Sequence, residues 1–86
     1  MNKLSVLVVE DEKDIAIAIE AYLINQGYKV FIGNNGIEGL EILEKENIHL
    51  AIVDIMMPKM DGINFTMKVR QTYDFPIIML SAKSEE

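Results

Sequence analysis

The sequence has no cysteine, no tryptophan and only two prolines among its 86 residues. Without cysteine it cannot form a disulfide, a zinc-thiolate site or a thiol nucleophile, and this composition fits the cytoplasmic location that we expect. Five glycines and 50% hydrophobic residues are not typical of a collagen-like or disordered chain. The composition therefore predicts a packed globular core, and the length predicts a single domain.

Positive charge and long apolar runs are also scarce. Eight Lys and Arg stand against 14 Asp and Glu, which gives a formal charge of -6. Such a balance argues against binding to a phosphate backbone, so we expect no direct contact of this segment with nucleic acid. The apolar run at residues 4–9 is too short for a signal sequence or a membrane span. We therefore expect no membrane partner.

Four short apolar runs predict β-strands, at residues 4–9, 28–32, 49–53 and 77–80. The first and last runs lack alternation, which is typical of strands that are buried on both faces. Helical spacing of apolar residues separates the runs and predicts three helices, at residues 13–26, from 36 to about 46, and at 61–73. Strands that alternate with helices indicate a parallel sheet built by right-handed crossovers, an α/β doubly wound domain.

The first predicted helix carries apolar residues over much of its circumference. One stripe should face the sheet and consists of Ile15, Ala18, Ile19, Tyr22 and Leu23. A second set lies off that stripe and consists of Ile17, Ala21 and Ile24. Burial against one sheet does not require so wide an apolar surface. The pattern therefore predicts a second partner for this helix.

The other two helices show recognisable starts. Asn35 is predicted to cap the second helix with Glu38 as its reciprocal acid, and Asp61 is predicted to cap the third. We expect the inward side chains of the two helices to be Ile37, Leu40, Leu43, Phe65 and Val69.

Acidic residues stand where two of the predicted strands end. Glu10 and Asp11 follow the first strand, and Asp54 follows the third. Neighbouring strands lie about 4.8 Å apart, which would bring Asp11 and Asp54 to within about 5 Å. Two carboxylates at that distance repel each other by about 3 kcal/mol at an effective dielectric constant near 20. Such a cluster favours either a cation or shifted pKa values of the carboxyl groups. A few carboxylates plus water are how proteins hold Mg²⁺.

A metal beside Asp54 suggests phosphoryl chemistry. Asp54 could act as the nucleophile toward a phosphorylated donor, with the metal offsetting charge. Ser81 follows the fourth strand and could hydrogen-bond a phosphoryl oxygen on Asp54. The ordinary alternative is that Glu10, Asp11 and Glu12 form a solvated helix start that complements the helix dipole.

The segments VLVVEDE, DIMMPKMDG and MLSAK, in this order and spacing, resemble the receiver domain of two-component response regulators. The resemblance implies a flavodoxin-like sheet with strand order 2-1-3-4. It also implies that Asp54 accepts a phosphoryl group from a partner sensor histidine kinase. The implied Mg²⁺ ligands are Asp11, Asp54 and the backbone carbonyl of Met56, with Glu10 acting through water. Ser81 resembles the hydroxyl that follows the phosphoryl group in the switch.

The resemblance also implies what accompanies this segment. Pro58, Asp61 and Gly62 resemble the turn between the site and the third helix. The motifs are similar to regulators whose receiver controls a winged-helix DNA-binding domain in transcription regulation, and that domain is not among these residues. Family receivers continue through a fourth helix, a fifth strand with an essential lysine and a fifth helix. Lys83 does not replace that lysine.

Residues 1–86 are accordingly expected to be a single incomplete receiver domain, truncated before the fourth helix. We expect two apolar surfaces to be left open, the first helix and the edge of the strand at residues 77–80. A homodimer or an element-swapped oligomer would cover them.

Three other functions compete with this interpretation. A Mg²⁺-dependent phosphohydrolase also uses an Asp at a strand end, but it typically needs an acid two residues later, where Met56 stands; we therefore do not expect an enzyme. A flavodoxin-like cofactor binder is disfavoured because the loop after the first strand is acidic rather than rich in Gly, Ser and Thr. An interaction or dimerisation module without phosphotransfer remains open.

Overall fold

The computed structural model describes residues 3–57 and 59–80. Pro58, Ser81 and Lys83 therefore lie outside the described residues. The described elements follow one another as β1 (Ser5–Val9), α1 (Lys13–Asn25), β2 (Lys29–Gly33), α2 (Gly36–Lys45), β3 (Leu50–Asp54), α3 (Gly62–Arg70) and β4 (Ile77–Leu80).

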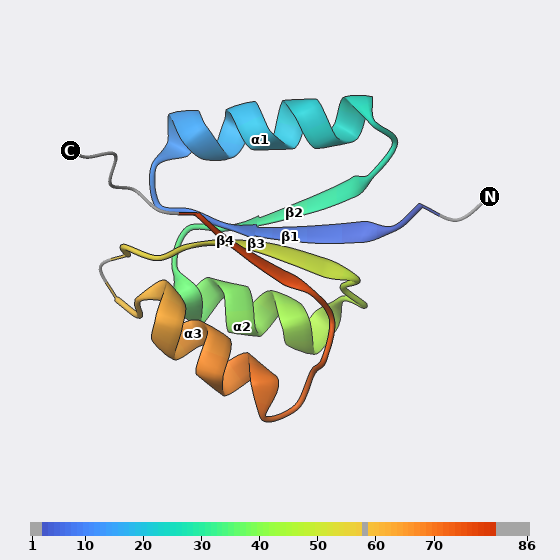
Figure 1. Cartoon of the computed structure of the whole chain (residues 1–86). Coiled ribbons are helices and arrows are strands. Elements are labelled where there is room, and N and C mark those ends of the chain that lie inside the picture. Colours follow the sequence, from blue (N-terminus) through green and yellow to red (C-terminus); the bar gives the residue numbers. More distant parts are fainter. Residues whose placement is uncertain (1–2, 58, 81–86) are drawn as a thin grey trace.

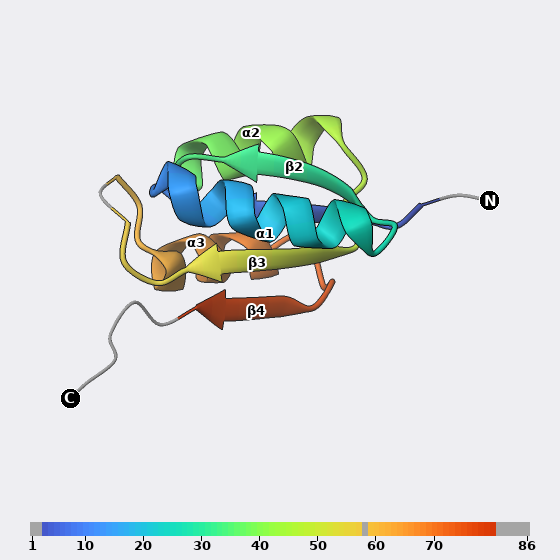
Figure 2. The same ribbon diagram turned by 90° about the horizontal axis from the view of Figure 1, so that it is seen from above.

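The four strands form one parallel sheet in the order β2-β1-β3-β4. This order confirms the predicted α/β doubly wound architecture. The arrows of β2, β3 and β4 in Figure 2 point the same way, and β1 pairs in parallel with β2 and β3, so the carboxyl ends of the strands share one edge of the sheet. β1 is central and entirely buried, as its apolar run without alternation predicts.

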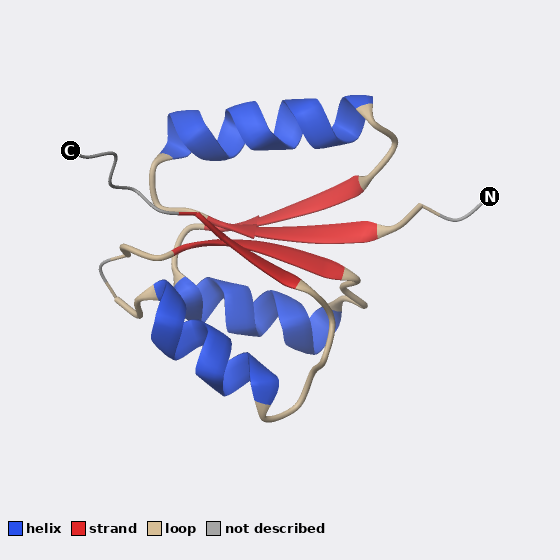
Figure 3. Ribbon diagram, viewed as in Figure 1, coloured by secondary structure: helices blue, strands red, loops and turns tan. Residues whose placement is uncertain are grey.

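Helices cover the two faces of the sheet unequally. α1 lies alone on one face, and α2 and α3 lie on the other (Figures 1 and 3). The core under α2 and α3 is built from nine buried residues: Leu7, Val9, Leu43, Ile48, Ala51, Val53, Met57, Phe65 and Val69. On the α1 face the buried cluster consists of Val6, Val8 and Leu23. No helix in the described ranges is long and apolar enough to cross a membrane.

The predicted inward face of α3 is confirmed, and that of α2 is confirmed in part. Phe65 and Val69 are buried in α3, as is Leu43 in α2. Ile37 was expected to face inward, but 47% of it is exposed. The two buried glycines of α2, Gly36 and Gly39, explain the difference. They form the side of the helix that approaches the rest of the core, and this rotates Ile37 outward.

The predicted inward stripe of α1 is wrong in most of its members. Leu23 is buried and Ile19 packs partly against the sheet, but Ile15 is 42% and Tyr22 is 64% exposed, and Ala18 is exposed too. Ala16 takes the inward position instead, since its small side chain lets the helix approach the sheet. The second set, Ile17, Ala21 and Ile24, is exposed as expected.

Local hydrogen bonds set the ends of the helices. The Asn35 side chain caps α2 by accepting from the Glu38 N–H at 2.9 Å, as predicted. The Glu38 carboxylate returns to the Asn34 N–H at 2.8 Å rather than to Asn35. α3 ends at Arg70, earlier than predicted. Turn hydrogen bonds continue past this point, and the Tyr73 N–H donates to the Val69 carbonyl at 2.8 Å. The Tyr73 hydroxyl donates to the Leu43 carbonyl at 3.1 Å, which joins this turn to α2.

Candidate functional site

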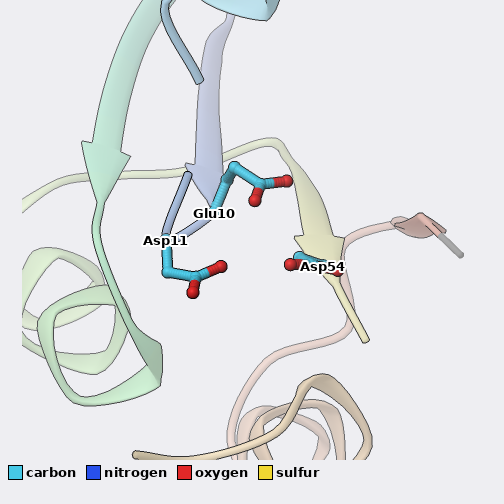
Figure 4. Close-up of side chains that lie close together, drawn as sticks. All are labelled: Glu10, Asp11 and Asp54. Carbon is cyan, nitrogen blue, oxygen red and sulfur yellow. The ribbon is translucent and has the colours of Figure 1, made fainter. Parts of the chain in front are cut away.

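Three carboxylates meet at the carboxyl ends of β1 and β3. The register pairs Val9 with Val53 on the two strands, so the residues that follow them lie next to each other. One carboxylate oxygen from each of Glu10, Asp11 and Asp54 lies within 4.8 Å of the others. Figure 4 shows the three side chains around the space between the two strand ends. The predicted proximity of Asp11 and Asp54 is therefore confirmed.

The three acids differ in burial. Glu10 is 3% and Asp54 is 5% exposed, whereas Asp11 is exposed to solvent. The backbone N–H of Glu10 donates to the Gly33 carbonyl at 3.0 Å, which joins this end of β1 to the end of β2. Glu10 and Asp54 therefore form the buried part of the cluster, and Asp11 lies on its solvent-exposed side.

Backbone N–H groups orient the two buried carboxylates. Oε2 of Glu10 accepts from the Glu12 N–H at 3.1 Å, and Oδ1 of Asp54 accepts from the Met56 N–H at 3.2 Å. Burial raises the pKa of Glu10 above its ordinary value, because a buried carboxyl favours its neutral form. The Glu12 N–H opposes this rise in the pKa of Glu10, while the carboxylates of Asp54 and Asp11 add to it. The site thus holds more negative charge than its surroundings offset.

The donor set fits a hard divalent cation. All three side chains offer oxygen, which Mg²⁺ prefers. The three oxygens lie within 4.8 Å of one another, so a side-chain adjustment, or a water between one acid and the ion, would let the three acids share one cation. The acids border a hollow of about 390 Å³ that Met56 and Leu80 also line.

The loop after β3 brings further predicted residues to this edge. Asp61 caps α3 by accepting from the Asn64 N–H at 2.8 Å, so its carboxylate serves the helix and is not part of the acid cluster. The backbone N–H of Gly62 donates to the Ile55 carbonyl at 2.8 Å. A Cβ at Gly62 would overlap the carbonyl oxygen of Asp54. Sequence reasoning missed this contact, although Asp-Gly before a helix was its signal.

Other predicted roles remain predictions. Met56 lies beside Asp54 through the hydrogen bond of its N–H, and its carbonyl stays a predicted metal ligand. The water-mediated role of Glu10 also stays a prediction. Ser81, the predicted partner of a phosphoryl group on Asp54, lies outside the described residues.

The sequence matches a known family model and two similar regulatory proteins. A family model described as "Response regulator receiver domain" matches residues 6–86. Regulatory protein VanR of Enterococcus faecium is 43% identical over 81 residues, which cover 94% of this chain and 35% of that protein. Regulatory protein VanRc of Enterococcus gallinarum is 40% identical over 81 residues, with the same coverage of both chains. The chain thus spans about a third of the length of these curated relatives.

The fold is also similar to solved structures. Response regulator protein TrrA of Thermotoga maritima, in complex with Mg(2+)-BeF, matches with a TM-score of 0.87 and 34% identity, over 94% of this chain and 71% of that chain. Chemotaxis protein CheY4 of Vibrio cholerae matches with a TM-score of 0.91 and 31% identity, over 98% of this chain and 72% of that chain. Given its sheet order, its acid cluster and these matches, the chain belongs to the family of response regulator receiver domains.

Proposed function

We propose that this chain receives the signal in a two-component system, with Asp54 accepting a phosphoryl group from a partner sensor histidine kinase. Mg²⁺ is bound by Asp11, Asp54 and the carbonyl of Met56, and Glu10 acts through water. The observation that carries the proposal is the meeting of three carboxylates within 4.8 Å at the ends of β1 and β3. The family match supports the same cation at this edge, as does the related TrrA protein in its complex with Mg(2+)-BeF.

The residues divide the chemistry between them. A carboxylate oxygen of Asp54 attacks phosphorus, the bond from phosphorus to the donor nitrogen breaks, and that nitrogen keeps the electron pair and takes a proton from solvent. When bound, Mg²⁺ offsets the charge that gathers on the phosphoryl oxygens. The Met56 N–H orients the Asp54 carboxylate through Oδ1. Burial of Glu10 and Asp54 keeps bulk water away from the nucleophile.

The proposal also covers what phosphorylation of Asp54 controls in the whole protein. The relatives are regulatory proteins, and one from Bacillus subtilis, 36% identical over 96% of this chain and 37% of that protein, is named an uncharacterized transcriptional regulatory protein. We infer that phosphorylation of Asp54 controls a DNA-binding domain in transcription. Cytoplasmic location, the absence of direct nucleic-acid contact by this segment, and its status as one incomplete domain stay predictions.

Measuring the intact mass of the chain tests whether Asp54 accepts a phosphoryl group. The chain is incubated with Mg²⁺ and a small acyl phosphate, with and without chelator. We expect a gain of one phosphoryl group that needs Mg²⁺ and disappears in Asp54→Asn. Asp14→Asn is the matched control, because it makes the same chemical change at an exposed residue in the first turn of α1. A gain that persists in Asp54→Asn, or no gain in a folded sample, would contradict the assignment of Asp54.

A phosphohydrolase is the rival use of the same acids. Met56 occupies the position where such an enzyme typically has its general acid, and its side chain has no proton to give a leaving group. We therefore propose no turnover of phosphate esters. Hydrolysis of a chromogenic phosphate monoester by the wild-type chain, lost in Asp54→Asn, would favour the rival.

A second copy of the chain is the partner that we propose for the open α1 face. Ile17, Tyr22 and Ile24 of α1 are each more than half exposed. β4 is one of the two edge strands of the described sheet, and its Ile78 is 50% exposed. In Figure 2, β4 lies beside the part of the sheet that α1 covers. Association through these apolar side chains would also serve the alternative function, an interaction module without phosphotransfer.

Light scattering after size-exclusion chromatography measures this association. We expect a dimer mass for the wild-type chain and a monomer mass for Ile17→Lys, because the charge opposes burial of that face. A folded wild-type chain that is monomeric at high concentration would contradict the proposal.

A further inference from the structure

The first turn of α3 rests directly on the end of β3, and Gly62 makes that contact. A Cβ at Gly62 would overlap the carbonyl oxygen of Asp54 and would lie 2.8 Å from the Cα of Ile55. The φ angle of Gly62 is not positive, whereas that of Gly27 is 96°. A side chain at position 62 is therefore excluded by lack of space rather than by backbone conformation.

The group that Gly62 touches is the peptide between Asp54 and Ile55. This peptide is held by a hydrogen bond from its Ile55 N–H to the Leu80 carbonyl at 3.1 Å. The following peptide, between Ile55 and Met56, is held by the Gly62 N–H, which donates to the Ile55 carbonyl at 2.8 Å. The next N–H, that of Met56, binds Oδ1 of Asp54. The direction of the Asp54 carboxylate and the position of Met56 thus follow from the placement of two successive peptide units, and Gly62 contacts both of them.

α3 has little room to retreat from this contact. Phe65 is fully buried one turn after Gly62 and belongs to the core cluster under α2 and α3. Its ring lies against Gly39 of α2, where an added Cβ would come within 2.9 Å of Cε1 of Phe65. Protein cores are close-packed, so moving Phe65 would either leave a cavity or crowd its neighbours, and both lower the stability of the fold. A side chain at position 62 would therefore displace the Asp54 peptide.

We propose that Gly62 is a positioning residue for the metal site and for the reaction of Asp54. It binds neither the cation nor the phosphoryl group. Its missing side chain lets the helix, which Phe65 anchors in the core, pack against the two successive peptides that orient the Asp54 carboxylate and place Met56. The inference rests on the proposed function. Residues that orient metal ligands typically change metal affinity by about 10- to 100-fold when they are replaced, so we expect at least a tenfold rise in the Kd for Mg²⁺ in Gly62→Ala.

Gly39→Ala is the matched control. It adds the same methyl group beside Phe65 and within 3.0 Å of Cγ2 of Val9, and the atoms that it meets belong to side chains rather than to the Asp54 peptide. Mg²⁺ affinity is measured by calorimetric titration at a temperature where both variants are folded, with thermal unfolding recorded in parallel. Both variants should be less stable than wild type, but only Gly62→Ala should lose Mg²⁺ affinity. Equal affinity losses, or wild-type affinity in a folded Gly62→Ala, would overturn the positioning role.

If Gly62→Ala does not fold, an NMR measurement on the wild-type chain tests the positioning role of Gly62 instead. In an NMR titration with Mg²⁺, the amide signal of Gly62 should shift together with that of Met56 and with the same Kd, while that of Gly27 stays in place. A Gly62 signal that does not move would overturn the inference and leave the metal site intact. No Mg²⁺ binding by the folded wild-type chain would instead overturn the proposed function, and the positioning role with it.

Discussion

Two buried regions of this molecule meet at the end of β3 and differ in what burial does for them. Under α2 and α3, apolar side chains such as Val53, Phe65 and Val69 have no more than 1% of their surface exposed. At the strand ends, Glu10 and Asp54 are almost as deeply buried, yet they carry like charges together with Asp11. Burial of the first group stabilises the fold. Burial of the second group opposes folding, because charge leaves water and meets more charge of the same sign.

The core makes the acid cluster possible. Val9 and Val53 pack on the α2 side, and the residues that follow them in the two strands form the site. Proteins are stable by only about 5 to 15 kcal/mol, so a cluster of repelling acids needs a well-packed neighbour. The difference between the two regions leads to four expected results.

The largest effect is expected in the core. Phe65→Ala should lower the free energy of unfolding by about 3 to 5 kcal/mol, since it removes a fully buried ring and leaves a cavity. Ile63→Ala in the same helix is the control, because Ile63 is 54% exposed and its loss should cost less than about 1 kcal/mol. Urea denaturation measures both. Similar losses for the two variants would show that α3 does not anchor this core.

The second effect is the response of the acid cluster to Mg²⁺. A cation that binds only the folded chain should raise the free energy of unfolding by about 2.7 kcal/mol at 100 times its Kd. Asp54→Asn should lose this response. Without Mg²⁺ that variant should be more stable than wild type, because one of three repelling charges is gone and the amide oxygen can still accept the Met56 N–H. Thermal unfolding with and without Mg²⁺ checks both statements.

If Asp54→Asn were less stable than wild type in chelator, the proposed difference between the apolar core and the acid cluster would be contradicted. That result would mean that burial of the carboxylates stabilises the fold, as burial in the apolar core does.

A smaller effect concerns pH and comes from Glu10. Its pKa is raised in the folded chain, mainly by burial, so the folded state binds a proton more readily than the unfolded state does. Above the raised pKa, ionised Glu10 therefore lowers stability, and this penalty disappears as pH falls through that pKa toward the ordinary value of 4.5. Glu10→Gln should be more stable than wild type at pH 7.5 in chelator.

The difference between wild type and Glu10→Gln should close as the solution is acidified. Denaturation of both proteins at a series of pH values from 7.5 down to the ordinary Glu pKa of 4.5 measures it. A constant difference across this range would show that Glu10 is not the group whose proton binding changes on folding.

The strands and the acid cluster could be predicted because their signals are local. An apolar run without alternation marks a buried strand, and β4 was predicted with its observed bounds. Acids placed directly after neighbouring parallel strands must meet at one edge of the sheet, so Asp11 and Asp54 were predicted to lie close together.

The errors arose where packing between elements decides. Periodicity does not choose between faces when a helix is apolar nearly all round, so it favoured Tyr22 over Ala16 for the inward side of α1. The small residues mark the close approaches, as Ala16 does in α1 and Gly36 and Gly39 do in α2. The contact of Gly62 with the Asp54 carbonyl is likewise a through-space distance that residue spacing does not report.

The smallest effect is expected on the open face of α1, where the adjacent residues Tyr22 and Leu23 differ most. Tyr22 is 64% exposed, and Leu23 is 8% exposed and packs on Val6 and Val8. Tyr22→Ser should change the free energy of unfolding by less than about 0.5 kcal/mol, whereas Leu23→Ala should lower it by about 2 kcal/mol or more. Urea denaturation at low protein concentration makes the comparison. If Tyr22→Ser were destabilising and its effect grew with protein concentration, the outer face of α1 would be buried against a second copy of the chain, and its apolar side chains would belong to a core shared by two molecules.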